Sequence, residues 1–460
     1  MTQKNNNDFT QGSILQNIMS MAIPITLGQL INILYSVVDR IYIGRIPGTA
    51  SLALTGLGLS IPVTTIVMAF SNLFGMGGAP LCSIERGKGN EKEAQAIMCN
   101  AFVLLVSTGL FLTMIGYLLK EPLLYLFGAS NETFPYANDY LSIYLSGTLF
   151  VMISLGMNQF INAQGFGRIG MITIMSGAAA NIILDPIFIF QFHMGIRGAA
   201  IATVLSQMIS ALWVLHFLTG KKALFCIEKH AMKLNASRVK NICALGLSGF
   251  IMGITNSLVS IVCNTTLQTC GGDLYVGIMT IINTIREVIS MPVSGITGGA
   301  QPVISYNYGA GAYKRVKSCI RVLSIIGIAY TGFVWILVSV LAEPLMRLFT
   351  DNTELIQAGL PCFHIYYAAF IAMSLQFTGQ SVFTSLGYSR QAVFFSLFRK
   401  VIIVIPLTLF LPTVCNPGVY GVFAAEPISN VVGGAACYIT MLTLILSSLN
   451  RLERMQTEGK

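Results

Sequence analysis

Apolar residues fill most of this chain in long runs, and short polar segments separate one run from the next. A helix of about 20 mostly apolar residues is long enough to cross the hydrocarbon core of a bilayer. The pattern therefore predicts an all-α integral membrane protein with twelve transmembrane helices. The predicted spans are residues 14–41, 51–80, 93–119, 134–163, 169–191, 196–218, 237–265, 273–306, 314–341, 356–386, 390–413 and 418–449.

The composition supports a membrane protein. Of the 460 residues 54% are hydrophobic and only 10% are charged, whereas about 25% are charged in a typical soluble domain. The net charge of +9 would suggest nucleic-acid binding in a soluble protein, but here the basic residues lie in loops. Eighteen of the 27 Lys and Arg residues fall in the termini and the even-numbered loops, and five fall on the opposite side. We therefore expect both termini in the cytoplasm and no nucleic-acid partner.

The second half of the chain repeats the first. A shift of 222 residues places Glu121-Pro122-Leu123 on Glu343-Pro344-Leu345, Gly165 on Gly387 and Arg168 on Arg390. One further inserted residue places Gly195 and Gly198 on Gly418 and Gly421. Six spans per repeat start both repeats on the same side, so the repeats are parallel. We predict an N-lobe over 1–218, a basic cytoplasmic linker over 219–240 and a C-lobe over 241–460.

Four acids lie inside predicted spans: Asp39, Asp185, Glu287 and Glu426. An ionisable residue at membrane depth is costly and marks a functional site by default. Asn181 precedes Asp185 by one helical turn, and Tyr35 precedes Asp39 by one turn. The alternative for Asp39 is an acid at a helix end, exposed or paired with Arg40. The alternative for Asp185 is a structural hydrogen bond to a neighbouring helix.

The repeats differ where these acids stand. The second half has Ile261 opposite Asp39 and Leu407 opposite Asp185, so a cation-coupling site is expected in the N-lobe alone. Thr203 and Asn158 add polar groups to the same lobe. Two carboxylates with Asn, Thr and Tyr oxygens can coordinate Na⁺ or share a proton, and the sequence favours neither.

The C-lobe acids have different expected roles. Glu287 follows Arg286, and an interhelical salt bridge is the favoured interpretation for it. Glu426 precedes Pro427 in the last span, and structural and substrate-binding roles have equal weight. For Arg399 and Lys400 we expect side chains that extend to the cytoplasmic interface. Pro186 can free the carbonyl of Ile182 and bend its helix.

No enzyme motif is present. The chain has no P-loop, HExxH or GxSxG sequence, so we expect no ATP hydrolysis and no enzymatic activity. Its ten Cys residues include no CxxC pair, and His and Cys show no metal-ligand spacing. No cofactor is expected beyond a coupling ion, H⁺ or Na⁺.

The chain resembles the multidrug and toxic compound extrusion (MATE) transporters, in their bacterial DinF-like branch. The resemblance covers nearly the whole chain. It rests on Tyr35…Asp39…Gly44, Gly75…Pro80…Gly87-Lys88-Gly89, Asn181…Asp185-Pro186, Gly195…Gly198-Ala199 and Gly299-Ala300-Gln301-Pro302-Val303-Ile304-Ser305-Tyr306-Asn307-Tyr308-Gly309-Ala310-Gly311.

The resemblance implies a V-shaped, two-lobe antiporter in the bacterial inner membrane that exports organic cations by alternating access. It assigns coupling to Asp39, Asn181, Asp185 and Thr203, with Tyr35 and Asn158 nearby, and helix bending to Pro24. Glu287 and Glu426 depart from the family pattern and are further candidates for the substrate cavity. The expected partners are membrane lipid and small cationic or amphipathic substrates, and the expected state is a monomer.

Two other functions are compatible with twelve spans. A lipid-linked or saccharide flippase of the same superfamily would need a cationic cavity and resembles chains with about two more helices. A non-transporting membrane scaffold would need a soluble domain, but the longest loop has only about 22 residues.

Overall fold

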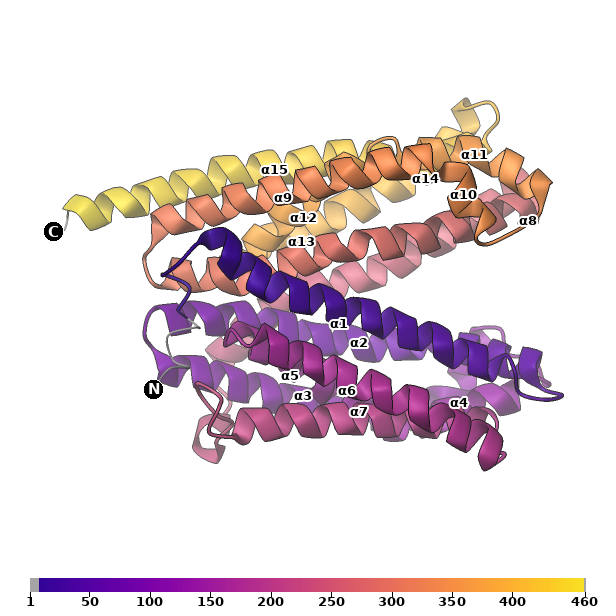
Figure 1. Ribbon diagram of the computed structural model, residues 1–460, viewed down its shortest axis with the longest axis horizontal. Coiled ribbons are helices and arrows are strands. Elements are labelled where there is room, and N and C mark those ends of the chain that lie inside the picture. Colours follow the sequence, from indigo (N-terminus) through magenta and orange to yellow (C-terminus); the bar gives the residue numbers. More distant parts are fainter. Residues whose placement is uncertain (1–7, 459–460) are drawn as a thin grey trace. The chain divides into compact units, whose positions relative to one another are not determined.

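The protein is an all-helical chain in the computed structural model, which describes residues 8–458 (Figure 1). No strand occurs in this range. The helices of the first half are α1 (Ile14–Ile43), α2 (Ala50–Gly87), α3 (Glu91–Leu126), α4 (Phe134–Ser146), α5 (Thr148–Ala163), α6 (Gly167–Pro186), η2 (Ile187–Gln191) and α7 (Ile196–Thr219). After the short η3 (Lys229–Met232) come α8 (Ala236–Gly309), α9 (Tyr313–Val340), α10 (Ala342–Arg347), α11 (Thr353–Tyr367), α12 (Phe370–Ser385), α13 (Ser389–Leu397), η4 (Phe398–Val404), α14 (Ile405–Val414) and α15 (Val419–Glu458).

These elements supply the twelve predicted spans. Nine helices within the described residues are long and apolar enough to cross a membrane, and the bent pairs α4–α5 and α11–α12 each add one more. The 74-residue α8 is two helices that meet at Gly272, whose φ of 71° is in the left-handed region that favours glycine. Counting α8 as two gives twelve, so the prediction of a multi-pass helical membrane protein is confirmed.

The chain forms two compact units. Within the described residues, the N-terminal unit holds 23–246, and the C-terminal unit holds 8–22 together with 247–458. Helix α1 is therefore shared, and its division falls between Ala22 and Ile23, one residue before Pro24. Asn307 and Arg315 tie the start of the chain to the C-terminal unit, because both side chains donate to the carbonyl of Phe9 at 3.1 Å.

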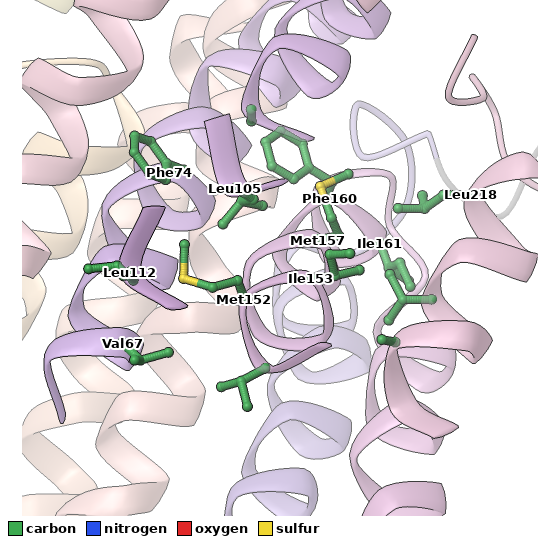
Figure 2. Close-up of a cluster of buried hydrophobic side chains, with 14 of the residues drawn as sticks. Val67, Phe74, Leu105, Leu112, Met152, Ile153, Met157, Phe160, Ile161 and Leu218 are labelled. Atoms are coloured by element: carbon green, nitrogen blue, oxygen red, sulfur yellow. The ribbon is translucent and has the colours of Figure 1, made fainter. Parts of the chain in front are cut away.

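The core of the N-terminal unit lies between α2, α3, α5 and α7. Figure 2 shows Phe74, Leu105, Met152, Met157 and Phe160 converging there, and all five side chains are buried. The helices approach closely because glycines face the larger side chains: a Cβ on Gly156 would lie only 2.6 Å from Leu105. Small residues at helix contacts are how membrane helices gain van der Waals packing. The C-terminal unit has two cores of its own, one around Phe383 and one around Tyr367.

The structure carries the duplication seen in the sequence. Gly89 and its counterpart Gly311 both have positive φ, as do Gly165 and Gly387. The Ser83 hydroxyl donates to the Ala163 carbonyl at 3.2 Å, and Ser305 donates to Ser385 at 2.7 Å. The fourth span bends by 56° after Gly147, and the tenth bends by 42° before Phe370. The same backbone conformations and the same hydrogen bond thus recur in both halves.

The linker over 219–240 is fixed to the N-terminal unit by buried amide side chains. Asn100 on α3 donates to the carbonyls of Ala231 and Lys233 at 3.3 and 3.1 Å and accepts from the backbone N–H of Asn235 at 3.0 Å. Asn235 then caps α8, because its side chain accepts from the N–H of Ser237 at 2.9 Å. The longest loop between spans is therefore held in one conformation by specific hydrogen bonds.

Two π-helices interrupt corresponding spans. Segment η2 continues the fifth span after Pro186, and η4 lies in the middle of the eleventh span. Proline has no N–H to donate, so a wider turn can follow it. Single π-helical turns are frequent at functional sites. Both of these spans carry buried ionisable side chains, as described next.

Candidate functional site

Asp39 on α1 and Asp185 on α6 come together in the N-terminal unit. Asp185 is fully buried and Asp39 is 9% exposed. Their carboxyl groups lie within hydrogen-bonding reach of each other and interact electrostatically. Two carboxyl groups this close must share a proton or bind a cation, since both cannot be ionised and buried without compensation. The expected partnership of the two acids is therefore visible in the geometry.

Polar side chains from four helices surround the pair. Asn181 donates its amide to Asp185 Oδ1 at 3.2 Å from the preceding turn of α6. Tyr35 lies one turn before Asp39 and interacts electrostatically with both acids. Tyr140 of α4 faces Asp39 and reaches Thr203 of α7 through its hydroxyl. Thr203 thus joins the site through Tyr140, a residue that the sequence analysis missed although it lies one turn from Tyr144 on the same helix.

The site holds an excess of hydrogen-bond acceptors. Asp39 Oδ1, Asp185 Oδ2 and Asn181 Oδ1 are buried, and none has a hydrogen-bond partner within the described part of the chain. Buried oxygens without donors are unfavourable by roughly 1–3 kcal/mol each, and more when charged. A proton or a small hard cation with oxygen ligands would satisfy them. This set of oxygen atoms therefore suits either H⁺ or Na⁺.

Asn158 lies apart from the acid pair. A Cβ on Gly170 would be 3.2 Å from Asn158 Oδ1, so this amide faces the start of α6. Asp185 is fifteen residues further along that helix, about 22 Å at 1.5 Å per residue. The amide oxygens of Asn158 and Asn162 are both buried, and neither has a hydrogen-bond partner among residues 8–458. Asn158 can serve only a second, separate polar position in the same unit.

The C-terminal unit contains a buried charge cluster that the sequence analysis did not predict. Glu426 on α15 accepts from Arg399 Nη1 at 3.1 Å and from Lys400 Nζ at 3.2 Å. Arg286 Nη1 on α8 lies 3.8 Å from the same carboxylate. Arg399 and Lys400 are 8% and 4% exposed, so the expectation that they extend to the interface is wrong. Both side chains pair with Glu426 on another span instead of extending to the aqueous interface.

Glu287 differs from its expected role. Glu287 is exposed, and it forms no ion pair with the other residues that the structure describes. Arg286 pairs with Glu426 instead, because adjacent residues on a helix point in different directions. The favoured salt bridge at Glu287 is therefore wrong. Glu426 has a structural role, and it also lines a cavity.

Pro24 lies where α1 changes the unit that it packs against, and Pro186 lies where α6 changes helix type. Pro24 stands between two close contacts: Gly299 packs on Ala22 in the C-terminal unit, and Gly28 packs on Ile174 in the N-terminal unit. Pro186 ends the regular part of α6, and η2 begins at the next residue. Asp185 therefore precedes a change of helix type, where the backbone cannot keep its regular hydrogen bonds.

The profile of the MatE family matches residues 24–187 and 250–410. The chain belongs to the MatE family. These two matched segments follow the two repeats; the first contains Asp39 and Asp185, and the second contains Arg286, Arg399 and Lys400 but ends before Glu426. As MATE transporters are not enzymes, the expectation of no enzymatic activity is confirmed.

Among characterised relatives, the multidrug export protein MepA of Staphylococcus haemolyticus is 27% identical over 448 residues, which is 96% of each chain. A multidrug resistance MATE family transporter solved in an outward-facing conformation superposes with a TM-score of 0.90 at 20% identity, covering 97% of this chain and 99% of that one. A transporter of the MOP superfamily from Pyrococcus furiosus gives 0.90 at 20% identity, with 98% and 99% covered. The MATE fold is therefore shared over essentially the full length.

Proposed function

We propose that this MATE transporter exports small cationic or amphipathic molecules in exchange for an inward-moving cation. The observation that supports the proposal is the buried pair of Asp39 and Asp185, with acceptor oxygens that lack donors. A relative of similar length is a multidrug export protein, which supports small molecules as substrates.

The acid pair supplies a mechanism for coupling. With the cation bound, the buried carboxylates are compensated and the site is stable. When the cation leaves, the uncompensated charge disfavours the closed site and favours an organic cation in the same unit. The coupling cation and the organic cation then bind alternately to the same carboxylates. This competition couples substrate export to the cation gradient. Alternating access, which is the general mode of two-repeat transporters, completes the cycle.

The coupling ion is H⁺ or Na⁺, and the site offers an oxygen set for either. Asp39, Asp185, Asn181 and Thr203 are the proposed ligands or proton-sharing groups. Both termini are proposed to be cytoplasmic, on the charge distribution of the loops. The chain is proposed to act as a monomer in the bacterial cell membrane.

The test uses purified protein in liposomes with a fluorescent organic cation, and imposes Na⁺ and H⁺ gradients separately. Asp39→Asn and Asp185→Asn should each abolish gradient-driven exchange, because one neutral amide cannot replace a carboxylate in the shared site. Asp351→Asn is the matched control, since Asp351 is an exposed loop acid. Gradient-driven exchange that survives in both site variants would overturn the coupling assignment.

A further inference from the structure

The charge cluster of the C-terminal unit is not balanced. Three basic side chains, Arg286, Arg399 and Lys400, surround Glu426, and among the described residues it is the one acid within 4 Å of any of them. Glu287 is exposed on the adjoining position of α8 and faces elsewhere. In formal charges, the three bases exceed Glu426 by two, and they exceed Glu426 and Glu287 together by one.

The contacts of Glu426 are already fully used. Its Oε1 receives Arg399 and Lys400, and its Oε2 receives Lys400 at 3.3 Å. Arg399 is held a second time by Asn430 Oδ1 at 2.6 Å. Gly433 makes room for its stem, since a Cβ there would lie 2.9 Å from Arg399 Cγ. Arg399 is therefore a fixed structural cation, and the surplus lies with Arg286 and Lys400.

Hydrogen-bond donors are in surplus at the same place. Arg286 Nε is buried and has no partner among the described residues. Lys400 has three N–H donors, and both of its contacts are to Glu426. Tyr366 donates to Asn283 Oδ1 at 3.2 Å, which leaves the amide hydrogens of Asn283 for another acceptor. The group that would satisfy these donors is an acceptor with negative charge.

A cavity lies between these donors. Asn283, Arg286, Tyr366, Lys400 and Glu426 line it, together with Cys263 and neighbouring residues of the C-terminal unit. Its empty space is about 410 Å³, counting the part that opens outward. The part of this space that is not open to solvent is small, with room for a group the size of one carboxylate. The fork of an arginine matches a carboxylate well, because parallel N–H groups meet its two oxygens.

The repeat explains how one fold carries two opposite sites. The offset that places Gly198 on Gly421 also places Thr203 on Glu426. The fifth and eleventh spans both contain a π-helix, beside Asp185 in one repeat and at Arg399 and Lys400 in the other. Corresponding spans thus carry buried acids in the N-terminal unit and buried bases in the C-terminal unit, at different positions along the spans.

We propose that the cavity of the C-terminal unit binds the carboxylate group of amphoteric substrates, between Arg286, Lys400 and Asn283. This inference rests on the proposed export function and names a substrate class for it: molecules that carry both a cationic centre and a carboxylate. Glu426 holds the bases in place and neutralises part of their charge. The positive charge that remains suits a single carboxylate.

The test compares two dyes that differ only in the carboxyl group, rhodamine 110 with a free carboxyl and its methyl ester rhodamine 123. Wild-type protein in liposomes should export both. Arg286→Gln should lower export and binding of rhodamine 110 by about tenfold or more, the usual effect of losing a charged hydrogen bond, and leave rhodamine 123 within twofold. Arg347→Gln is the matched control, since that arginine forms an exposed pair with Glu343.

Binding by fluorescence polarisation with purified protein, and the melting temperature in detergent, accompany the transport assay. Equal losses for both dyes in folded Arg286→Gln protein, or no loss for either, would overturn the proposal. Displacement of rhodamine 110 by chloride alone, as effective as displacement by benzoate, would assign the cavity to inorganic anions and also overturn it. Should neither dye be exported, the export function fails, and selective binding of rhodamine 110 still decides the inference.

Discussion

Glu426 is the residue on which the buried charges of the C-terminal unit depend. Its carboxylate contacts Arg399, Lys400 and Arg286, so Glu426→Gln leaves three cations without an acid partner. Breaking a buried ion pair from one side costs about 3–5 kcal/mol, and we expect a large fall in thermal stability. Glu453→Gln removes another acid with two lysine partners, but at a solvent-screened site where only a small loss of stability is expected.

The melting temperature of each variant in detergent measures this difference. Adding Lys400→Met to Glu426→Gln removes one uncompensated cation and should restore part of the loss. Similar shifts for Glu426→Gln and Glu453→Gln would show that the cluster is hydrated and stabilises little.

The polar residues of the N-lobe could be predicted from the sequence, whereas the charge cluster of the C-lobe could not. Asp39 and Asp185 could be identified because an acid inside an apolar run has few explanations. The cluster at Glu426 could not, because its members come from three spans and no local pattern pairs them. Arg399 and Lys400 looked like interfacial residues, since a long basic side chain can reach water from the same position. Only the fold shows that their acid partner is nearer.

At the scale of elements, Asn100 binds the backbone of the linker over 219–240, and the linker also packs into the core of the N-terminal unit through Phe225. Asn100→Leu keeps the branched shape of the side chain but removes three hydrogen bonds to the linker backbone. Each buried backbone group left unpaired costs about 1–3 kcal/mol, so we expect the linker to detach locally. Trypsin cleavage at Lys229 and Lys233 should accelerate at least tenfold, read by mass spectrometry of the fragments. Asn131→Leu, on an exposed loop, is the control, and an equal cleavage rate in the two variants would refute the clamp.

The spans themselves could be predicted closely, since hydrophobic length alone defines a transmembrane helix. Their interruptions could not. The breaks of the fourth and tenth spans fall at Gly147 and at Ala368–Ala369, and only the first has a residue that suggests a break. The π-helix at Arg399 and Lys400 has no proline before it, and no local pattern in the sequence predicts it.

At the scale of the whole molecule, the duplicated fold combines an acidic and a basic interior. The repeat fixes the helix order, the broken spans and the glycine turns in both halves, whereas the ionisable residues have diverged. Each unit can therefore bind groups of opposite charge. This divergence is visible in the sequence as Leu407 and Ile261 opposite the two aspartates, but the replacement chemistry is visible only in the structure.

Helix α1 is the element that both units share, and Pro24 stands beside the point where it passes from one to the other. Pro24→Ala restores an N–H that can donate to the Ser20 carbonyl, and alanine is up to about 3 kcal/mol more favourable than proline inside a helix. We therefore expect the variant to melt at a higher temperature and yet to exchange substrate several-fold more slowly, because α1 bends less readily. Pro62→Ala in α2, which lies wholly in the N-terminal unit, should keep its transport rate. Transport in liposomes and melting in detergent separate the two effects, and a Pro24→Ala variant that transports at the wild-type rate would show that α1 need not bend.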